Sequence, residues 1–419
     1  MKTKPYYIQI PGKVSEILPI LENEPPFKGF NLDNLRIILS IICTHQRKED
    51  NNNIYAQLVM KFLRKKVWNA DIYIHHLMEI GIIERFGGYV PKEHAYKYRF
   101  TPAYQSPHIT TELKNQKLIN KIHNVNVEKG RKASRKYPKQ NQQIKSMTIN
   151  ESAIELSIEK FPDKEDLKKL NYALGAIARI QNQEFYTTVD DTGNRLHTNL
   201  TNLPKFLRSE IQINKKHISG VDIRNSQPYI ATKYLTNPES GKEFFPGKFP
   251  LMMLKCLRLP EQHDVKEFLL LTSKAQFYKF LETKFNKRGL DYEVISPDNV
   301  SQRLKDKVFQ ILFDKNHHTS KEKRIFNELF PGVNKAFSVL RMEKYTNFVN
   351  SLQKMESHII LDVILKRLNF EYPEMVATQI YDNVCTSVAT DDIEITSIVM
   401  TEELTKFIGL PPVLKIEKF

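Results

Sequence analysis

The chain has 419 residues, of which 41% are hydrophobic and 26% charged, so it is predicted to be globular with about two to four domains. Its formal net charge of +15 predicts a polyanionic partner, nucleic acid first and an anionic membrane surface second. No run approaches the ~20 apolar residues of a membrane span, and MKTKPYYIQIPGKV lacks the apolar core of a secretory signal. With nucleic acid as the favoured partner, we expect no membrane association and a cytoplasmic location, in a bacterial host or with a phage or mobile element. The three widely spaced cysteines predict reduced thiols, without a disulfide framework or a zinc site.

Residues 1–104 are predicted to contain a small domain of helices closed by a two-stranded wing. The stretches LDNLRIILSIICTH and NIYAQLVMKFLRKKV have helical apolar spacing. Asn69 is the predicted N-cap of a further helix, followed by a short strand, a Gly-Gly turn and a Tyr-rich strand. This order is similar to a winged helix. Docking to a duplex or protein, and a packing role without nucleic acid, remain equal alternatives because a fold does not define a function.

Residues 105–150 are predicted to be a basic linker or extended segment. Between Lys114 and Lys145 there are ten Lys or Arg residues and one acid, Glu128. The stretch EKGRKASRKYPKQNQQ lacks apolar periodicity. A solvated linker is the alternative, but the basic composition of the whole chain favours contact with phosphates.

The rest of the chain predicts an α+β layout. Helical spacing returns over residues 151–185. From about residue 186, the strand-like runs ISGVDI and ATQIYDNVCTSVA alternate with helical patterns at 228–288, 297–345 and 349–368.

Two acids end apolar strand-like runs in this region. Asp382 lies at the tip of a predicted hairpin, where Asp-Asn is also a common turn former. Asp222 ends the run ISGVDI. If the two strands are neighbours, the carboxylates lie close together, which is costly unless a cation lies between them. Hard oxygen ligands favour Mg²⁺, as in the two-metal sites of phosphoryl transfer.

A third element fits the same chemistry. SPDNVSQRLKDKVFQILF is predicted to be a helix with Ser296 as its cap, followed by Pro297 at its first position and Asp298 in its first turn. Arg303 and Lys307 are four residues apart and therefore share one face. A solvated basic face is the alternative, but aimed at a metal site this face would hold a triphosphate.

Four stretches, in order, resemble the motifs of family A DNA polymerases. TGNRLHTNLTNLPKFLR (192–208) is similar to TGRLSSxxPNLQNIPxR with one inserted residue, and GVDIRNSQPY (220–229) resembles xADYSQIE. The predicted helix after residue 296, followed by ELFPGVNKAF (328–337), resembles the fingers helix TPEQRRxAKxxNFGxxYG and the YPGV that follows it. QIYDNVCTS (379–387) resembles QVHDELVFE. The resemblance covers roughly residues 186–400, and the shared order makes it stronger than any single motif.

The resemblance implies a right-hand polymerase core with palm and fingers over residues 191–419, an antiparallel palm sheet and fingers at about 230–345. Residues 151–190 would then be reduced thumb-like helices, and no proofreading domain is expected. Asp222 and Asp382 fall on the metal-binding carboxylates, which use Mg²⁺ with Mn²⁺ as a substitute. Arg303 and Lys307 fall on the pair that holds the nucleotide phosphates.

Five further residues fall on positions that contact the primer–template in the family. They are Arg195, Asn202, Arg208, Gln353 and Glu356.

Three positions depart from the family pattern. Asn383 stands where the second hairpin acid is expected. Tyr229, reached with one inserted residue, stands for the Glu that excludes the ribose 2′-hydroxyl, and its ring is predicted to exclude that hydroxyl by bulk. Ile311 stands for the aromatic residue four past the Lys. Tyr229 and Ile311 are therefore the predicted nucleotide-binding positions beside the basic pair.

Together these features predict a monomeric, template-directed DNA polymerase that adds dNTPs to a DNA primer–template, in the replication of a phage, plasmid or mobile element. A single-subunit RNA polymerase is the second enzyme hypothesis. The hypothesis from another class is a DNA-binding replication initiator or regulator without catalysis.

Overall fold

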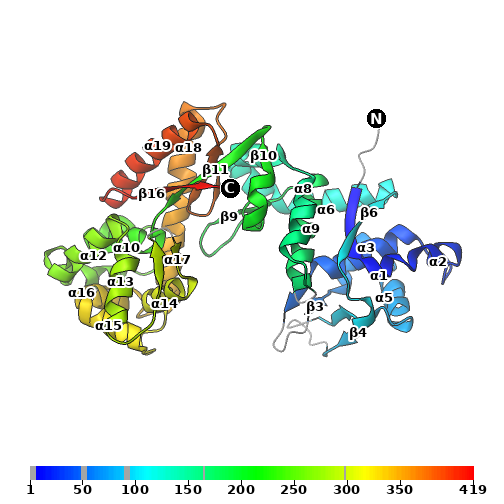
Figure 1. Ribbon diagram of the computed structural model, residues 1–419, viewed down its shortest axis with the longest axis horizontal. Coiled ribbons are helices and arrows are strands. Elements are labelled where there is room, and N and C mark those ends of the chain that lie inside the picture. The colour runs from blue at the N-terminus through cyan, green and yellow to red at the C-terminus, as the bar shows by residue number, and fades with distance from the viewer. Residues whose placement is uncertain (1–5, 49–53, 89–94, 164–165, 297–298) are drawn as a thin grey trace. The chain divides into compact units, whose positions relative to one another are not determined.

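The computed structural model describes residues 6–48, 54–88, 95–163, 166–296 and 299–419 (Figure 1). The chain divides into two compact units, which we call the first unit (residues 1–188 and 198–215) and the second unit (residues 189–197 and 216–419). Both are mixtures of helices and antiparallel sheets, which confirms the α+β prediction at the level of fold class. Within the described ranges, no helix is long and apolar enough to span a bilayer.

The N-terminal part of the first unit contains a four-stranded antiparallel sheet of order β2-β3-β5-β4. The strands are β2 (Gln46–Lys48), β3 (Ile54–Gln57), β4 (Ile83–Phe86) and β5 (Lys97–Phe100), and the helices are α1 (Gly12–Ser15), α2 (Leu18–Asn23), α3 (Leu32–Thr44), α4 (Met60–Lys66) and α5 (Ala70–Glu79). Asn69 is at the N-cap of α5, although its side chain makes no capping bond.

The predicted two-stranded wing is half of this sheet. NIYAQLVMKFLRKKV, predicted as helix, instead begins with strand β3, where buried Ala56 pairs with buried Tyr98 of β5. The helical spacing of that stretch applies only to α4. The winged-helix interpretation itself remains a prediction.

Residues 105–150 fold, and the prediction of an extended segment is wrong. Strand β6 (His108–Leu113) pairs antiparallel with β1 (Tyr6–Pro11), and helices α6 (Gln116–Lys136) and α7 (Pro138–Lys145) follow the short helix η2 (Pro102–Tyr104) and β6. Leu118, Ile119 and Ile122 of α6 are buried in the core of the N-terminal part. These three residues are helically spaced, but they come just before the basic run. The charge of that run led to the prediction of an extended segment.

The first unit is completed by α8 (Ser152–Lys160), α9 (Leu167–Gln181) and η4 (Lys205–Glu210), together with β7 (Met147–Ile149) paired with β10 (Ile211–Ile213). The helical prediction for residues 151–185 is confirmed. Strands β8 (Thr187–Val189) and β9 (Leu196–Thr198) include the points where the chain passes from one unit to the other.

Four antiparallel strands, which belong to a six-stranded sheet, are the centre of the second unit. Strand β11 (Lys216–Ile223) pairs on one side with β15 (Asn383–Ser387), which pairs with β14 (Thr378–Ile380), and it also pairs with β16 (Leu414–Lys418). Helix α19 (Thr390–Ile408) packs on β11 and β15. Val221 and Val384, opposite each other in register, are fully buried, so this sheet forms a rigid support for the side chains at its end.

Helices make up most of the second unit, as predicted (Figure 1). They are α10 (Ser226–Thr236), η5 (Pro238–Gly241), α11 (Lys248–Cys256), η6 (Leu259–Glu261), α12 (His263–Ser273), α13 (Phe277–Asn286), α14 (Gln302–Phe313), α15 (Lys321–Leu329), α16 (Pro331–Leu340), α17 (Tyr345–Ser357), the π-helical turn η7 (His358–Ile364) and α18 (Leu365–Glu371). Edge-to-face contacts of Phe268 with Phe277, Phe330 and Phe337 join α12, α13 and α16 into one aromatic core.

The start of α14 differs from the prediction. The helix begins at Gln302, and Ser301 caps it by accepting a hydrogen bond from the Leu304 backbone N–H (3.3 Å). Ser296 belongs to β12 (Val294–Ser296), which pairs with β13 (Asn299–Val300), so it is not the cap. Pro297 and Asp298 lie outside the described residues.

Candidate active site

The structure brings the two strand-end acids to the same end of one sheet. Asp222 on β11 is directly opposite Asn383 on β15, and Asp382 precedes Asn383 in the two-residue turn between β14 and β15. Both acids are half-buried. Adjacent antiparallel strands hold facing residues about 5 Å apart between Cα atoms, so Asp222 lies close to Asn383, the residue that follows Asp382.

Left-handed backbone conformations border this site. Tyr381 (φ 58°) forms the turn before Asp382, Asn225 (φ 55°) precedes helix α10, and Asn194 (φ 54°) lies in the loop at residues 190–195. Such conformations are uncommon for residues other than glycine, and they concentrate where the surrounding structure must hold a side chain in place.

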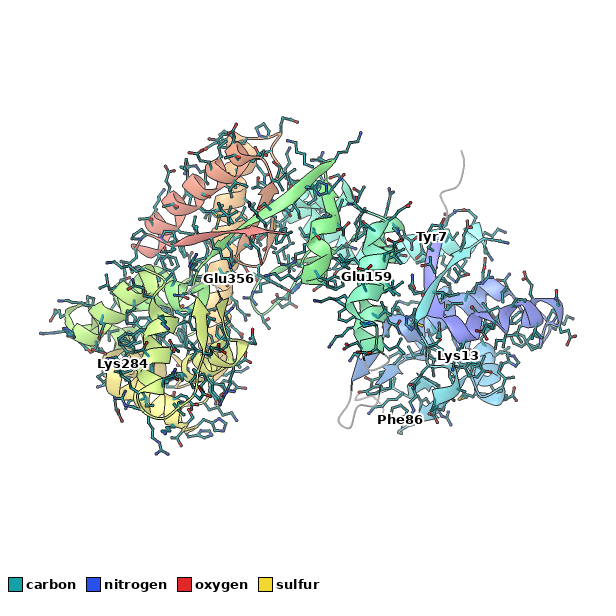
Figure 2. The ribbon with its side chains drawn as sticks, viewed as in Figure 1. Tyr7, Lys13, Phe86, Glu159, Lys284 and Glu356 are labelled. Carbon is teal, nitrogen blue, oxygen red and sulfur yellow. The ribbon has the colours of Figure 1, made fainter. Side chains whose placement is uncertain are left out.

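Glu356 is the most deeply buried acid of the site. It lies on α17, labelled in Figure 2, with only 2% of its surface exposed. The guanidinium of Arg195 donates to its Oε1 from Nη2 (2.6 Å) and Nε (3.1 Å). On the other oxygen, Gln227 Nε2 donates a hydrogen bond and Ser226 Oγ lies at 3.5 Å. Glu356 therefore connects the loop at 190–195, helix α10 and helix α17.

Asp190 organises the loop that carries Arg195. Its Oδ1 accepts hydrogen bonds from the backbone N–H groups of Thr192 (2.9 Å) and Gly193 (2.6 Å), and its Oδ2 accepts one from the N–H of Arg195 (3.2 Å). His197 Nε2 lies 3.0 Å from Oδ2. Partial burial acts to raise the pKa of Asp190, but these hydrogen bonds outweigh it and lower the pKa to about 2.

The same loop is seated on α17 through Gly193. Ser357 Oγ donates to the Gly193 carbonyl (2.9 Å). A Cβ atom at position 193 would lie 2.8 Å from Gln353 Oε1 and 2.9 Å from Gln353 Cβ, so this contact requires glycine. Gln353, Glu356 and Arg195, all predicted to contact primer–template, are thus brought together.

The site is electrostatically crowded. Loss of hydration raises the pKa of Glu356, and the charge of Asp382 raises it further, against the effect of Arg195. Loss of hydration also raises the pKa of Asp382, against hydrogen bonds from its backbone and from Ser226. Burial is the main cause of both shifts, because it disfavours the charged form of a carboxyl group.

A residue not identified from the sequence also belongs here. Glu417 on β16 pairs in register with Gly220, and its Oε2 accepts a hydrogen bond from Asn383 Nδ2 (2.9 Å). Its charge contributes to the raised pKa of Asp382. A Cβ at position 220 would lie 2.3 Å from Asn383 Oδ1, so the glycine makes room for the amide. The alternation in LKIEK (414–418) was the available signal, but nothing local in the sequence links it to Asp382.

The donor set suits a hard cation. Among the described residues, no group of three or more His, Cys, Asp or Glu side chains is placed to hold a metal ion. Mg²⁺ does not require one, because it binds through one or two carboxylates together with substrate phosphates and water. Asp222 and Asp382 stay the predicted ligands.

Arg303 and Lys307 lie on the outer face of α14, whose inner face buries Leu304, Val308 and Ile311. Arg303 Nη1 donates to the Asp291 carbonyl (3.2 Å), and its guanidinium lies over the Tyr292 ring. Lys307 Nζ donates to Gln310 Oε1 (3.0 Å). Each side chain therefore keeps its charge at the surface, where an anionic ligand can reach it.

Two residues predicted to contact the nucleotide are buried in this structure, and their nucleotide contact stays a prediction. Tyr229 is 1% exposed, and its hydroxyl donates to the Leu410 carbonyl (2.6 Å), so its ring has no surface for a sugar. Burial raises its pKa. Ile311 is 2% exposed in the core beneath α14. Both residues lie at helical apolar positions, and that pattern outweighs their place in the motif alignment.

Asn202 and Arg208 lie in the first unit, whereas the other predicted site residues lie in the second. Asn202 is exposed, and its Nδ2 donates to the Tyr186 hydroxyl (2.5 Å). Arg208 is half-buried on η4. Their contact with primer–template remains a prediction.

Comparison with known proteins gives a distant likeness. No family model matches the chain, and no curated protein matches it. Among solved structures, it is similar to the POL domain of Pol1 from M. smegmatis in complex with DNA primer-template and dNTP, with 11% sequence identity and a TM-score of 0.38. The alignment covers 64% of this chain and 55% of that chain, so the chain spans only about half the length of this neighbour.

Proposed function

We propose that this chain is a template-directed DNA polymerase that adds dNTPs to the 3′-hydroxyl of a primer. The observation that carries the proposal is the convergence of Asp222 and Asp382 at one end of a buried antiparallel sheet, through the pairing of Asp222 with Asn383. The ordered resemblance of four sequence stretches to family A polymerases supports the same reaction. Replication of a phage, plasmid or mobile element is the context that this resemblance favours.

The residues of the site have separable roles in this proposal. Asp222 and Asp382 would hold Mg²⁺ or Mn²⁺, which when bound supplies a Lewis acid for the attacking hydroxyl and the leaving pyrophosphate. Arg303 and Lys307 bind the triphosphate. The Arg195–Glu356 pair is a positioning element, because it fixes the 190–195 loop against helices α10 and α17.

Sugar selection no longer has an assigned residue, because Tyr229 is buried. The preference for dNTPs therefore depends on the resemblance of TGNRLHTNLTNLP to the DNA polymerase motif. The alternative hypothesis, a single-subunit RNA polymerase, would use NTPs in place of dNTPs with the same predicted metal ligands.

Primer extension tests the proposal. The wild type and the Asp222→Asn and Asp382→Asn variants are supplied with Mg²⁺ or Mn²⁺, DNA or RNA templates, and either dNTPs or NTPs. Either substitution should lower the rate by about 100-fold or more, because metal-ion catalysis contributes several kcal/mol. Affinity for primer–template should change little. Asp391→Asn, which alters an exposed acid in the first turn of α19, is the matched control and should retain wild-type activity.

The outcomes separate the hypotheses. Incorporation of NTPs in preference to dNTPs would replace the DNA polymerase with an RNA polymerase. DNA binding without incorporation of either nucleotide would favour the third hypothesis, a DNA-binding replication initiator or regulator without catalysis. Normal turnover by Asp382→Asn would remove the carboxylate pair from the mechanism.

A further inference from the structure

A surface cavity of about 640 Å³ lies in the first unit. The acids of the candidate active site belong to the second unit. The cavity lies between the end of α8, the start of α9 and the segment 201–206. Its lining includes Phe161, Lys168, Lys169, Tyr172, Asn202 and Phe206. Cavities of this size accommodate small ligands or a single residue of a polymer.

Aromatic rings form the apolar part of the cavity. Phe161 and Phe206 meet edge to face, with 5.5 Å between ring centroids and an interplanar angle of 81°. Tyr172 is 51% exposed, so one face of the cavity presents an accessible ring. Its hydroxyl donates to the Asn202 carbonyl (2.7 Å), which holds the ring at a fixed orientation without covering it. A planar apolar group can therefore stack here at little cost in side-chain entropy.

The charges at the cavity are positive. Lys168 and Lys169 are in the first turn of α9, and none of the described residues that line the cavity is acidic. Lys169 is 68% exposed; its Nζ lies over the Phe161 ring and is also bonded to Asp166 (2.7 Å) outside the lining. The cavity thus joins ring surfaces to two ammonium groups, which matches a ligand that is both planar and anionic.

We propose that this cavity binds a base of a single-stranded nucleic acid, stacked on Tyr172, with an adjacent phosphate held by Lys168 and Lys169. The chain's net charge of +15 favours a nucleic acid over an apolar peptide as the occupant. The biological role of the site rests on the proposed function, because it would hold a strand of the polymerase's substrate. The binding chemistry itself does not require catalysis.

Fluorescence anisotropy with the full chain tests the site. The probes are a fluorescein-labelled dT 12-mer and a 12-mer of the same backbone in which every base is absent. Stacking of one base on an aromatic ring changes affinity by about 5- to 150-fold. Tyr172→Leu should therefore reduce the preference for the base-containing probe by at least about 5-fold, whereas Tyr172→Phe should keep it.

Three further variants complete the test. Lys168→Ala with Lys169→Ala should weaken both probes equally and lower the salt dependence. Phe370→Ala, which removes an 86% exposed ring from α18 of the second unit, should change neither measurement. Asp382→Asn should bind both probes as the wild type does, so loss of catalysis is distinguished from failure of this site.

Two results would overturn the proposal. Equal affinity of the wild type for the two probes would show that bases are not recognised. An unchanged base preference in Tyr172→Leu would show that stacking occurs elsewhere and would leave an apolar peptide side chain as the occupant to examine.

Discussion

Replacing Arg195 by Ala should destabilise the second unit strongly. Glu356 is 2% exposed, and Arg195 is the cation bonded to it, through two nitrogens at 2.6 and 3.1 Å. Removing one partner of a buried ion pair costs about 3–5 kcal/mol, because the remaining charge is left without compensation. Arg195→Ala with Glu356→Gln should recover most of this loss, since the amide can still bond to Gln227 and Ser226.

Native-state hydrogen exchange is the appropriate assay. The one tryptophan, Trp68, lies in the first unit and is 85% exposed, so its fluorescence does not report on this site. Exchange of the amides of β15 and α17 reports on it directly. At 1.36 kcal/mol per tenfold change, a loss of about 3 kcal/mol should accelerate exchange by about 150-fold.

The loss should also depend on pH. Burial raises the pKa of Glu356 in the folded protein, so folding favours its protonated form. Such a group lowers stability as pH rises from its unfolded pKa of about 4.3 through its folded pKa. The difference between Arg195→Ala and the wild type should therefore be largest above the folded pKa and shrink as pH falls toward about 4. A pH-independent difference, or no rescue by Glu356→Gln, would show that Arg195 acts through packing and not through charge.

The remaining predictions concern phosphates and the sugar. Arg303→Ala and Lys307→Ala should each raise KM for dNTP by about 10-fold or more, as expected for lost hydrogen bonds to a charged group, with little change in primer–template affinity. The control is Lys305→Ala, which lies 200° around α14 from Arg303 by helical geometry. An equal loss of duplex affinity would show that Arg303 and Lys307 contact the nucleic acid and not the triphosphate. Lys117, Lys121 and Arg135 are exposed basic residues of α6. Replacing all three by Gln should lower the slope of log affinity against log salt by about 2.7, if each contacts one phosphate. An unchanged slope would show that α6 does not contact the nucleic acid. Tyr229→Phe should cost about 1 kcal/mol of stability through the lost bond to Leu410 and leave the ratio of dNTP to NTP incorporation unchanged, and a changed ratio would restore Tyr229 as a sugar gate.

Local patterns account for the predictions that hold. Alternation in ISGVDI and the hairpin in ATQIYDNVCTSVA placed Asp222 and Asp382 at strand ends, because side-chain period and turn residues act over a few neighbouring positions. The same reasoning failed at residues 54–57 and 105–150. There a short strand and the apolar positions of α6 were hidden by neighbouring residues with a stronger pattern.

Burial of individual side chains required the tertiary structure. Tyr229 and Ile311 occupy motif positions that suggest a nucleotide contact, yet each lies on the inner face of its helix. A sequence alignment records position along the chain, whereas the face that a helix presents depends on what packs against it. The motif positions therefore did not predict that these two side chains are buried.

The sequence by itself determined the basic character of the chain, the mixture of helices and short strands, and the two acids at strand ends, because composition and short-range periodicity encode these features. Only the tertiary structure paired Arg195 with Glu356, 161 residues away, and placed Glu417 beside Asn383, 34 residues away. The physical reason is that these contacts depend on the register of β11 with β15 and β16 and on the seating of Gly193 against Gln353. Such long-range packing leaves no local periodic signal in the chain.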